Sequence, residues 1–482
     1  MSNLDSRARW LALIVLCLGD LMIVLDTTIV NVALPSIRAD LGFTQDSLAW
    51  VVNAYLLTFG GFLLLGGRLG DLYGHRRLFV AGIGLFTLAS VGCGLATSQG
   101  VLIAARTVQG LGGAVVSAVA LSLMMTLFTE PADRAKAMGV FGFVASGGGS
   151  IGVLLGGVIT DVLDWHWIFL VNVPIGVLVY VLSLRLIPES PRAARGARLD
   201  VAGAITVTAS LMVYAIVNGN SAGWTSLQTL GLLGLAAVLM ATFLVLESRV
   251  AAPLVPLRLF SHRNLSISNA VGILWAAAMF AWFFLSALYL QLVLGYSPLQ
   301  VGLAFLPGNL VMGAMSVWAS ARIVMRFGIR LPLAAGLGVA AIGLVLFARA
   351  PVDGNYLVDV LPAMILLGFG AGIAFNPVLL AAMGDVEPAE AGLASGVVNT
   401  SFMMGGALGL AILASIATAR TNSLVKAGEG ALSALNGGYR LSFLVGALFA
   451  AAAAAIGAAF LRQPAPAHGH KEVGAPAAAT AD

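Results

Sequence analysis

The chain has 482 residues, of which 60% are hydrophobic and 10% are charged, and its mean hydropathy is +0.99. A water-facing surface needs far more charge than this, so the composition excludes a soluble globular protein and indicates a polytopic membrane protein. The net charge of +4 is spread over short loops, which argues against a nucleic-acid partner and leaves the lipid bilayer as the expected one.

Apolar windows of about 20 residues, the length that a helix needs to cross a bilayer, occur fourteen times. The first six lie near 10–34, 47–66, 78–97, 100–128, 138–159 and 167–187. Two more lie near 200–217 and 227–246, and the last six near 265–292, 300–320, 332–350, 359–383, 393–417 and 439–461. The first window is too long for a cleaved secretion signal, so we expect it to remain as a transmembrane helix.

Basic residues predict the orientation of these helices. If the N-terminus is cytoplasmic, 19 lysines and arginines fall on the inner side, 5 on the outer side and Arg106 inside a helix, which accounts for all 25. An even number of spans places both termini on the same side. We therefore expect both termini in the cytoplasm.

Two polar, proline-bearing loops, at 188–198 and 247–263, bracket the central pair of windows. They predict a six-helix bundle over residues 1–198, an inserted helix pair with its flanking loops over 199–264, and a second six-helix bundle over 265–462. A weak echo between GGRLGDLYGHRRLF and ARIVMRFGIRLPL suggests that the bundles are repeats, which would place a transport path between them. The Ala/Pro-rich segment 463–482 is expected to be a disordered cytoplasmic tail.

The first apolar window contains two acidic residues, Asp20 and Asp26. An acid at that depth costs about 2.5 to 3.5 kcal/mol on insertion scales, so it normally faces a protein interior or a cavity and marks an ion or substrate path. The structural alternative is that each acid is protonated or paired and only holds helices together. Asp20 lies six residues from Asp26, about 120° around the helix and 9 Å along it, so the two acids need not share a pocket.

Arg106 is the one basic residue placed within a span. At 1.5 Å per residue it lies about 9 Å below the outer surface, and Asp26 lies about 12 Å below it. An arginine beside an acid favours the ionised form, whereas removal from water favours the neutral form, so a small rearrangement could change the charge of Asp26. Proton coupling requires such a change.

Three strings of the chain stand out: LDTTIVNVALPSI at 25–37, which contains Asp26, DWHWIFLVNVPIG at 164–176 and GLASGVVNTSFMMGGALG at 392–409. The loop after the second window contains Gly67, Asp71, Gly74, Arg76 and Arg77, and the fourth window contains Arg106, Gln109 and Gly110, with Gly113 following.

Together these motifs resemble the major facilitator superfamily, and specifically its fourteen-helix drug:proton antiporter branch. The string at 25–37 is similar to the signature of that branch, with Asp26 in its acidic position. The loop after the second window matches the superfamily's loop motif, and the fourth window matches its Arg-x-x-Gln-Gly motif, which is associated with proton transfer.

The resemblance implies an all-α polytopic membrane fold of two six-helix bundles with two inserted central helices. It also implies a proton-coupled exporter of small amphipathic compounds such as drugs, antiseptics or secondary metabolites, in a bacterial cell membrane. Its partners would be protons and a small-molecule substrate, and we expect it to act as a monomer. No enzyme activity, cofactor or metal site is expected.

The loop motif suggests a cytoplasmic gate. Its glycines allow a tight turn, and Asp71 could cap the positive end of a neighbouring helix, which the family resemblance identifies as the one starting near Gly392. We also expect Arg76 and Arg77 to pair with Glu390 and its acidic neighbours across the halves. The alternative is a positive-inside anchor with solvated charges.

The fifth window carries glycines at the spacing of the family's antiporter motif, at Gly139, Gly148, Gly152, Gly156 and Gly157. Val153 stands where that motif has proline, so the bend that a proline would cause is not expected. The glycines alternatively serve only as a ridge for close helix packing.

Other functions are weaker candidates. An uptake symporter or facilitator of a small metabolite stays open because of Val153, and so does a sensor that binds its ligand without moving it. The chain contains no Gly-Lys dipeptide, so it has no Walker-type phosphate loop for ATP. The methionine pairs at 124–125 and 403–404 and the aromatic run 282–284 are interpreted as lipid-facing or packing residues rather than a dedicated drug site. The substrate's identity and charge stay open.

Overall fold

The computed structural model describes residues 6–128, 130–189, 257–384, 386 and 391–462, together with isolated positions between 231 and 249. Within these residues the chain is helical apart from short connections, and no strand is described there. The expected span at 200–217, most of the one at 227–246 and the tail at 463–482 lie outside the described residues.

The first half forms a series of long apolar helices, because a helix satisfies all of its own backbone hydrogen bonds inside a bilayer. They are α1 (Ser6–Leu41), α2 (Gln45–Leu48), α3 (Trp50–Tyr73), α4 (His75–Gly94), α5 (Gln99–Leu127), α6 (Pro131–Val162), α7 (Trp167–Leu170) and α8 (Asn172–Leu186). The turn between α3 and α4 is a single residue, Gly74, at φ 95°, a conformation that suits glycine.

The second half begins with a short 3-10 helix, η1 (Leu257–Ser261), and α12 (Arg263–Leu288), which continues into a π-helix, η2 (Tyr289–Val293). The expected span at 300–320 is a run of three pieces: α13 (Pro298–Ala314), the π-helix η3 (Met315–Ala319) and α14 (Ser320–Phe327). The remaining elements are α15 (Arg330–Phe347), the π-helix η4 (Tyr356–Val360), α16 (Leu361–Met383), α17 (Ala391–Lys426) and α18 (Ala431–Phe460).

Ten helices among the described residues are long and apolar enough to cross a membrane. The expected total of fourteen is not reached within these residues, partly because the central pair of spans falls mostly outside them. The all-helical membrane architecture that the composition predicts is what the structure has.

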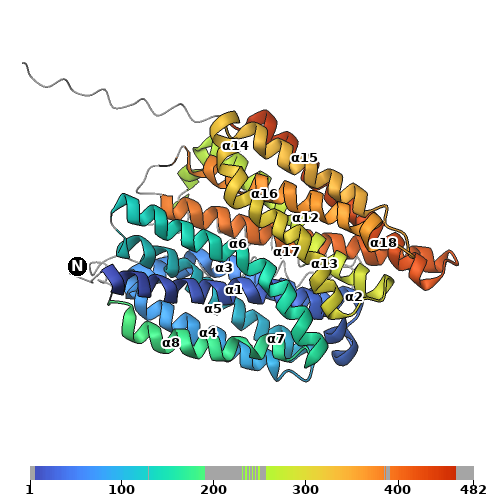
Figure 1. Ribbon diagram of the computed structural model, residues 1–482, viewed down its shortest axis with the longest axis horizontal. Helices are drawn as coiled ribbons and strands as arrows, with labels where there is room; N and C mark the ends of the chain where they lie inside the picture. Colours follow the sequence, from blue (N-terminus) through green and yellow to red (C-terminus); the bar gives the residue numbers. More distant parts are fainter. Residues whose placement is uncertain are drawn as a thin grey trace, which may run out of the picture.

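The helices form two packed groups (Figure 1). Helices α1, α3, α4, α5, α6 and α8 pack among themselves, as do α12, α13, α15, α16, α17 and α18. The groups meet mainly where α6 packs on α13 and α3 packs on α17, with smaller contacts from α1 to α12 and α13. Helix α1 therefore packs against helices of its own group and also contacts the second group.

Two contacts between the groups are close. A Cβ atom added at Gly157 of α6 would lie 2.6 Å from the carbonyl oxygen of Pro298, at the start of α13. On α1, the carbonyl oxygen of Val32 accepts a hydrogen bond of 2.8 Å from Nε2 of Gln291 in η2. Both contacts lie toward the ends of α1 and α6 that are remote from the N-terminus. The groups also meet closely near the start of α17, where a Cβ atom added at Gly396 would lie 2.6 Å from Leu64 Cδ2 of α3.

Candidate functional site

Asp26 is fully buried on α1, and its hydrogen-bond partners among the described residues belong to the first group of helices. Arg106 Nη1 on α5 donates to Oδ2 at 2.5 Å. Gln109 Nε2 on α5 and Asn172 Nδ2 on α8 donate to Oδ1 at 2.7 Å and 3.0 Å. Both carboxylate oxygens are therefore occupied, and the charge is balanced by a buried arginine.

Arg106 is itself fully buried and well partnered. Its Nε donates to the carbonyl oxygen of Val51 on α3 at 2.9 Å, and its Nη1 also donates to Oε1 of Gln109 at 2.7 Å. The guanidinium lies 4.3 Å from the centre of the Tyr55 ring, so cation–π attraction adds to the pairing. A buried ion pair is tolerable only when its remaining hydrogen-bonding groups are met in this way.

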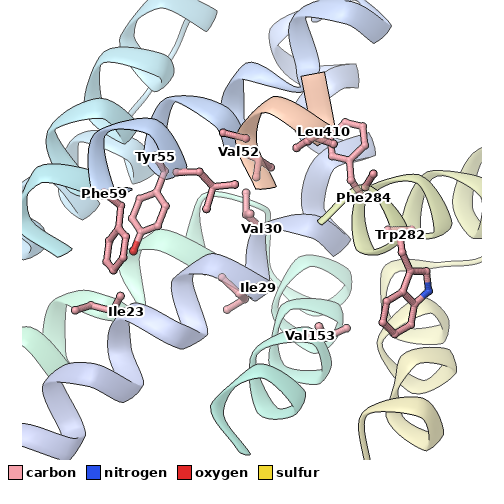
Figure 2. Packing of buried hydrophobic residues seen from close by; sticks show 14 of the residues in the cluster. Ile23, Ile29, Val30, Val52, Tyr55, Phe59, Val153, Trp282, Phe284 and Leu410 are labelled. Atoms are coloured by element: carbon pink, nitrogen blue, oxygen red, sulfur yellow. The ribbon is translucent and has the colours of Figure 1, made fainter. Parts of the chain in front are cut away.

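The Tyr55 ring is held by Phe59, one turn further along α3. Their centroids lie 5.7 Å apart with a 24° angle between the rings, and Figure 2 shows the two side chains alongside one another. Tyr55 and Phe59 are both buried. The aromatic pair therefore gives the arginine a fixed apolar wall.

Gln109 connects the pair to α4. Its Nε2 also donates to Oγ of Ser90 at 2.9 Å, and Cys93 Sγ lies 3.5 Å from its Oε1. Side chains from α1, α4, α5 and α8, with a backbone group from α3, thus meet around one carboxylate. We call Asp26, Arg106, Gln109 and Asn172 the Asp26 network.

This arrangement links a charge to helix packing. Protonation of Asp26 would remove the negative charge that balances Arg106 and would weaken the hydrogen bonds to one carboxyl oxygen. The buried guanidinium would then lack a counter-ion, which is costly unless the helices move. A proton on Asp26 can therefore change the relative positions of α1, α5 and α8.

The sequence predicted Asp26, Arg106 and Gln109 as site residues, and the structure brings these three together. The sequence analysis did not identify Asn172 and Ser90, because a single small polar residue in an apolar helix is usually interpreted as a packing residue. Asn172 falls inside the conspicuous segment at 164–176, so its polar character within an apolar run was the available signal.

Asp20 is not part of the Asp26 network. Its side chain is 7% exposed, and Ser117 Oγ on α5 donates to its Oδ1 at 3.3 Å. Asp20 and Asp26 have different hydrogen-bond partners, which agrees with the prediction that their side chains point in different directions from α1.

The predicted cytoplasmic gate residues lie at the junction of α3 and α4. Gly67 is on α3, Gly74 forms the turn, and Asp71 is on the last turn of α3. Arg76 lies within its own group: its Nη2 donates to the carbonyl oxygen of Leu184 on α8 at 2.5 Å, and its Nη1 lies 3.6 Å from the exposed carboxylate of Glu189. Arg77 is exposed. The expected partner Glu390 lies outside the described residues, so the gate stays a prediction.

The glycines of the fifth window lie on α6, which runs as one helix from Pro131 to Val162 through Val153. Gly148, Gly152 and Gly156 face α1: added Cβ atoms would lie 3.0 Å from Leu21 Cδ1, against Thr28 Oγ1 and 2.6 Å from the Ile29 carbonyl oxygen. Gly157 instead faces α13, and Gly139 lies nearer the start of the helix. The ridge therefore packs α6 against both α1 and the second group.

Among the described residues no group of three or more His, Cys, Asp or Glu side chains is placed to hold a metal ion. Both cysteines are free and buried. Of the two interpretations of the aromatic run, packing fits Trp282 and Phe284, because both are buried. Phe283 stacks on Phe305 of α13 with ring centres 5.5 Å apart.

Comparison with known proteins agrees with this architecture. The chain is 42% identical to Puromycin resistance protein pur8 of Streptomyces alboniger over 86% of this chain and 82% of that protein. It is 40% identical to Cephamycin export protein CmcT of Amycolatopsis lactamdurans over 85% of each chain. Its fold is similar to that of the nucleoside transporter NupG, with a TM-score of 0.67 at 12% identity, covering 94% of this chain and 100% of that one.

A family model described as Major Facilitator Superfamily matches residues 16–410, which include the Asp26 network and most of both helix groups. The relatives are bacterial proteins, and the apolar helices require a bilayer. The chain therefore belongs to the major facilitator superfamily, as a multi-pass protein of a bacterial cell membrane.

Proposed function

We propose that this protein exports small amphipathic organic compounds, such as drugs, antiseptics or secondary metabolites, in exchange for protons. The names of its relatives, a puromycin resistance protein and a cephamycin export protein, support export of an antibiotic-like compound. The Asp26 network is the observation that carries proton coupling, because it joins a protonatable group to the packing of three transmembrane helices.

In this proposal the two helix groups alternate access to a path between them. The chain has fourteen spans, with bundles at 1–198 and 265–462, the inserted pair at 199–264 and both termini in the cytoplasm. It acts as a monomer. Asp26 and Arg106 carry the proton step, and the loop motif at 67–77 serves as the cytoplasmic gate.

The energetics are sufficient for resistance. One proton returning through a membrane potential of about 100 mV contributes about 2.3 kcal/mol. At about 1.4 kcal/mol per decade, this supports a gradient of roughly 40-fold for an uncharged substrate. For a monovalent cation exchanged one for one with a proton, no net charge crosses the membrane, so the pH difference alone drives export.

The direct test compares the wild type with Asp26→Asn in an efflux-deficient bacterium and in everted membrane vesicles. The wild type should raise resistance to the exported compounds, and adding an exported compound to energised vesicles should release protons. Asp26→Asn should lose both properties while reaching the membrane in equal amounts. Equal resistance from the two proteins would refute the role of Asp26.

The continuous α6 helix at Val153 favours one alternative, a facilitator or proton symporter of a small metabolite. The same vesicles separate it from the exporter. Accumulation of the compound that does not respond to an imposed pH gradient would indicate a facilitator, and proton movement in the same direction as the compound would indicate a symporter.

A further inference from the structure

Gln291 joins the two helix groups near the outer end of α1. Its Nε2 donates to the carbonyl oxygen of Val32 at 2.8 Å, and Val32 is buried while Gln291 is half-buried. The neighbouring junction of α6 with α13, at Gly157 and Pro298, is a van der Waals contact. The hydrogen bond is directional, so it forms only when α1 and η2 lie in one relative position.

Pro35, inside α1, explains why a backbone carbonyl of this helix is open to a donor from another helix. Proline has no N–H, so the carbonyl of Asn31, four residues earlier, loses its helical donor, and the proline ring crowds the same turn. The Val32 carbonyl lies in that turn and has a second lone pair for an outside donor. The proline therefore makes the Val32 carbonyl a suitable acceptor for Gln291.

The π-helix η2 holds Gln291 to the second group. At the first residue of η2, the hydroxyl of Tyr289 donates to the carbonyl oxygen of Pro351, in the connection after α15, at 2.7 Å. Residues two positions apart point to different sides of a helix, so Tyr289 contacts the second group while Gln291 reaches the first. The N–H of Tyr296 donates to the Leu290 carbonyl oxygen at 2.9 Å and closes the end of η2. Movement of α1 away from the second group must therefore break the hydrogen bond from Gln291.

Apolar side chains separate this hydrogen bond from Asp26. Four buried residues of one hydrophobic cluster come from α1, α3, α12 and α17, and we call them the outer seal (Figure 2): Val30, Val52, Phe284 and Leu410. At 1.5 Å per residue, Val30 lies about 6 Å outward of Asp26 along α1 and about 3 Å inward of Val32. The outer seal therefore lies between the protonatable site and the outer end of α1.

Opening of the path toward the outer side requires the two groups to separate there, so it requires loss of the hydrogen bond from Gln291. Removal of one partly buried hydrogen bond shifts such an equilibrium by about two- to tenfold. Without this bond, the outer side would open more often in the absence of substrate. Water would then reach Asp26, and protons would cross the membrane without export of a substrate.

We propose that Gln291 is a coupling residue of the transport cycle, whose hydrogen bond to Val32 keeps the outer seal closed until a substrate is bound. The inference rests on the proposed function, because it assigns Gln291 a task within proton-driven export. Gln291 binds neither the proton nor the substrate. It positions α1 against the second group and so prevents proton entry that brings no export.

The test measures proton leak without substrate in everted vesicles, where the outer face of the protein faces the lumen. After the lumen is made acidic, Gln291→Met, which keeps the length of the side chain but has no N–H, should dissipate the pH gradient at least threefold faster than the wild type. Gln99→Met is the matched control, because Gln99 Nε2 donates to the carbonyl oxygens of Leu41 and Gly42, at 3.1 Å and 2.9 Å, within the first group. Its leak should stay within about 1.5-fold of the wild type.

Adding Asp26→Asn to Gln291→Met should return the leak to the wild-type rate, because the proposed leak passes through Asp26. A leak that persists in the double variant would come from general damage to the helix packing and would overturn the proposal. A wild-type leak rate in Gln291→Met alone would also overturn it.

A second readout does not depend on the proton step. Leu410→Cys, in the outer seal, should react with a membrane-impermeant maleimide in intact cells at least threefold faster when Gln291→Met is present, after subtraction of the labelling of chains without the added cysteine. Equal labelling rates would overturn the proposal. Normal transport by Asp26→Asn alone would reject the proposed proton step and leave this labelling difference intact, so the two failures are distinguishable.

Discussion

Asp26 accepts hydrogen bonds from side chains on α5 and α8, so its charge determines how α1 fits against both helices. Its principal partner, Arg106, also reaches α3 through the carbonyl oxygen of Val51. The pair is thus a structural element of the first helix group as well as its protonatable site. We therefore expect a substitution at Asp26 or Arg106 to affect the stability of the protein differently from its transport activity.

We expect Arg106→Gln to destabilise the protein more than the double change Asp26→Asn with Arg106→Gln. The single variant leaves a buried carboxylate without its cation, a loss of about 3 to 5 kcal/mol, whereas the double variant removes both charges. The measurement is thermal unfolding in detergent. Arg349→Gln, at an exposed arginine, is the control and should match the wild type. A double variant that is less stable than Arg106→Gln would contradict this account.

At this scale, part of the site is predictable from the sequence. The rise of a helix places Asp26 and Arg106 at similar depth, since both positions can be counted from the helix ends. Asn172 and Ser90 could not be identified as site residues, because the direction of a side chain on an apolar helix depends on helix packing, which one sequence does not reveal. The partner of Arg76 on α8, the carbonyl oxygen of Leu184, was missed for the same reason.

Helix α6 lies between α1 and α13 and uses different glycines for each. Gly148, Gly152 and Gly156 bring it close to α1, and Gly157 brings it close to Pro298. Movement of α1 can therefore pass through α6 to the second group. The sequence predicted this ridge from glycine spacing, but the division of its faces required the positions of both neighbours.

We expect Gly157→Ala to reduce transport at least tenfold. Its new methyl group would lie 2.6 Å from the Pro298 carbonyl oxygen, which disfavours the conformation in which α6 and α13 are in contact. Gly149→Ala is the matched control on the same helix, because its methyl group would lie 3.8 Å from its nearest neighbour, Thr28. Initial transport rates in vesicles with equal protein content test the pair. Similar rates for both variants would show that this contact has no role in transport.

Across the whole molecule, the two helix groups are joined by α6 with α13, by α3 with α17 and by the hydrogen bond from Gln291 to Val32. The Asp26 network lies on one side of these junctions, entirely within the first group. The apolar windows predicted the helices of both groups well, because length and hydropathy alone define a span. They did not predict the π-helices η2, η3 and η4, whose irregular turns have no composition signal.

The fourteen-span topology can be tested by labelling single cysteines with a membrane-impermeant maleimide. Cysteine in place of Ser221, between the two central windows, should react in intact cells. Cysteine in place of Ala478, in the tail, should react only after permeabilisation. Cys17 and Cys93 are buried and should give little background in the unmodified chain. Labelling of Ser221→Cys only after permeabilisation would contradict the topology.

The hydrogen bond from Arg106 to Val51 has a consequence for genetics. Its acceptor is a backbone carbonyl, which every amino acid supplies, so exchanging the Val51 side chain cannot remove it. A saturation mutagenesis screen for lost resistance should therefore recover Asp26, Arg106 and Gln109 while tolerating small apolar residues at Val51. Neither a mutagenesis screen nor a comparison of residue types at position 51 would therefore detect this hydrogen bond to Arg106.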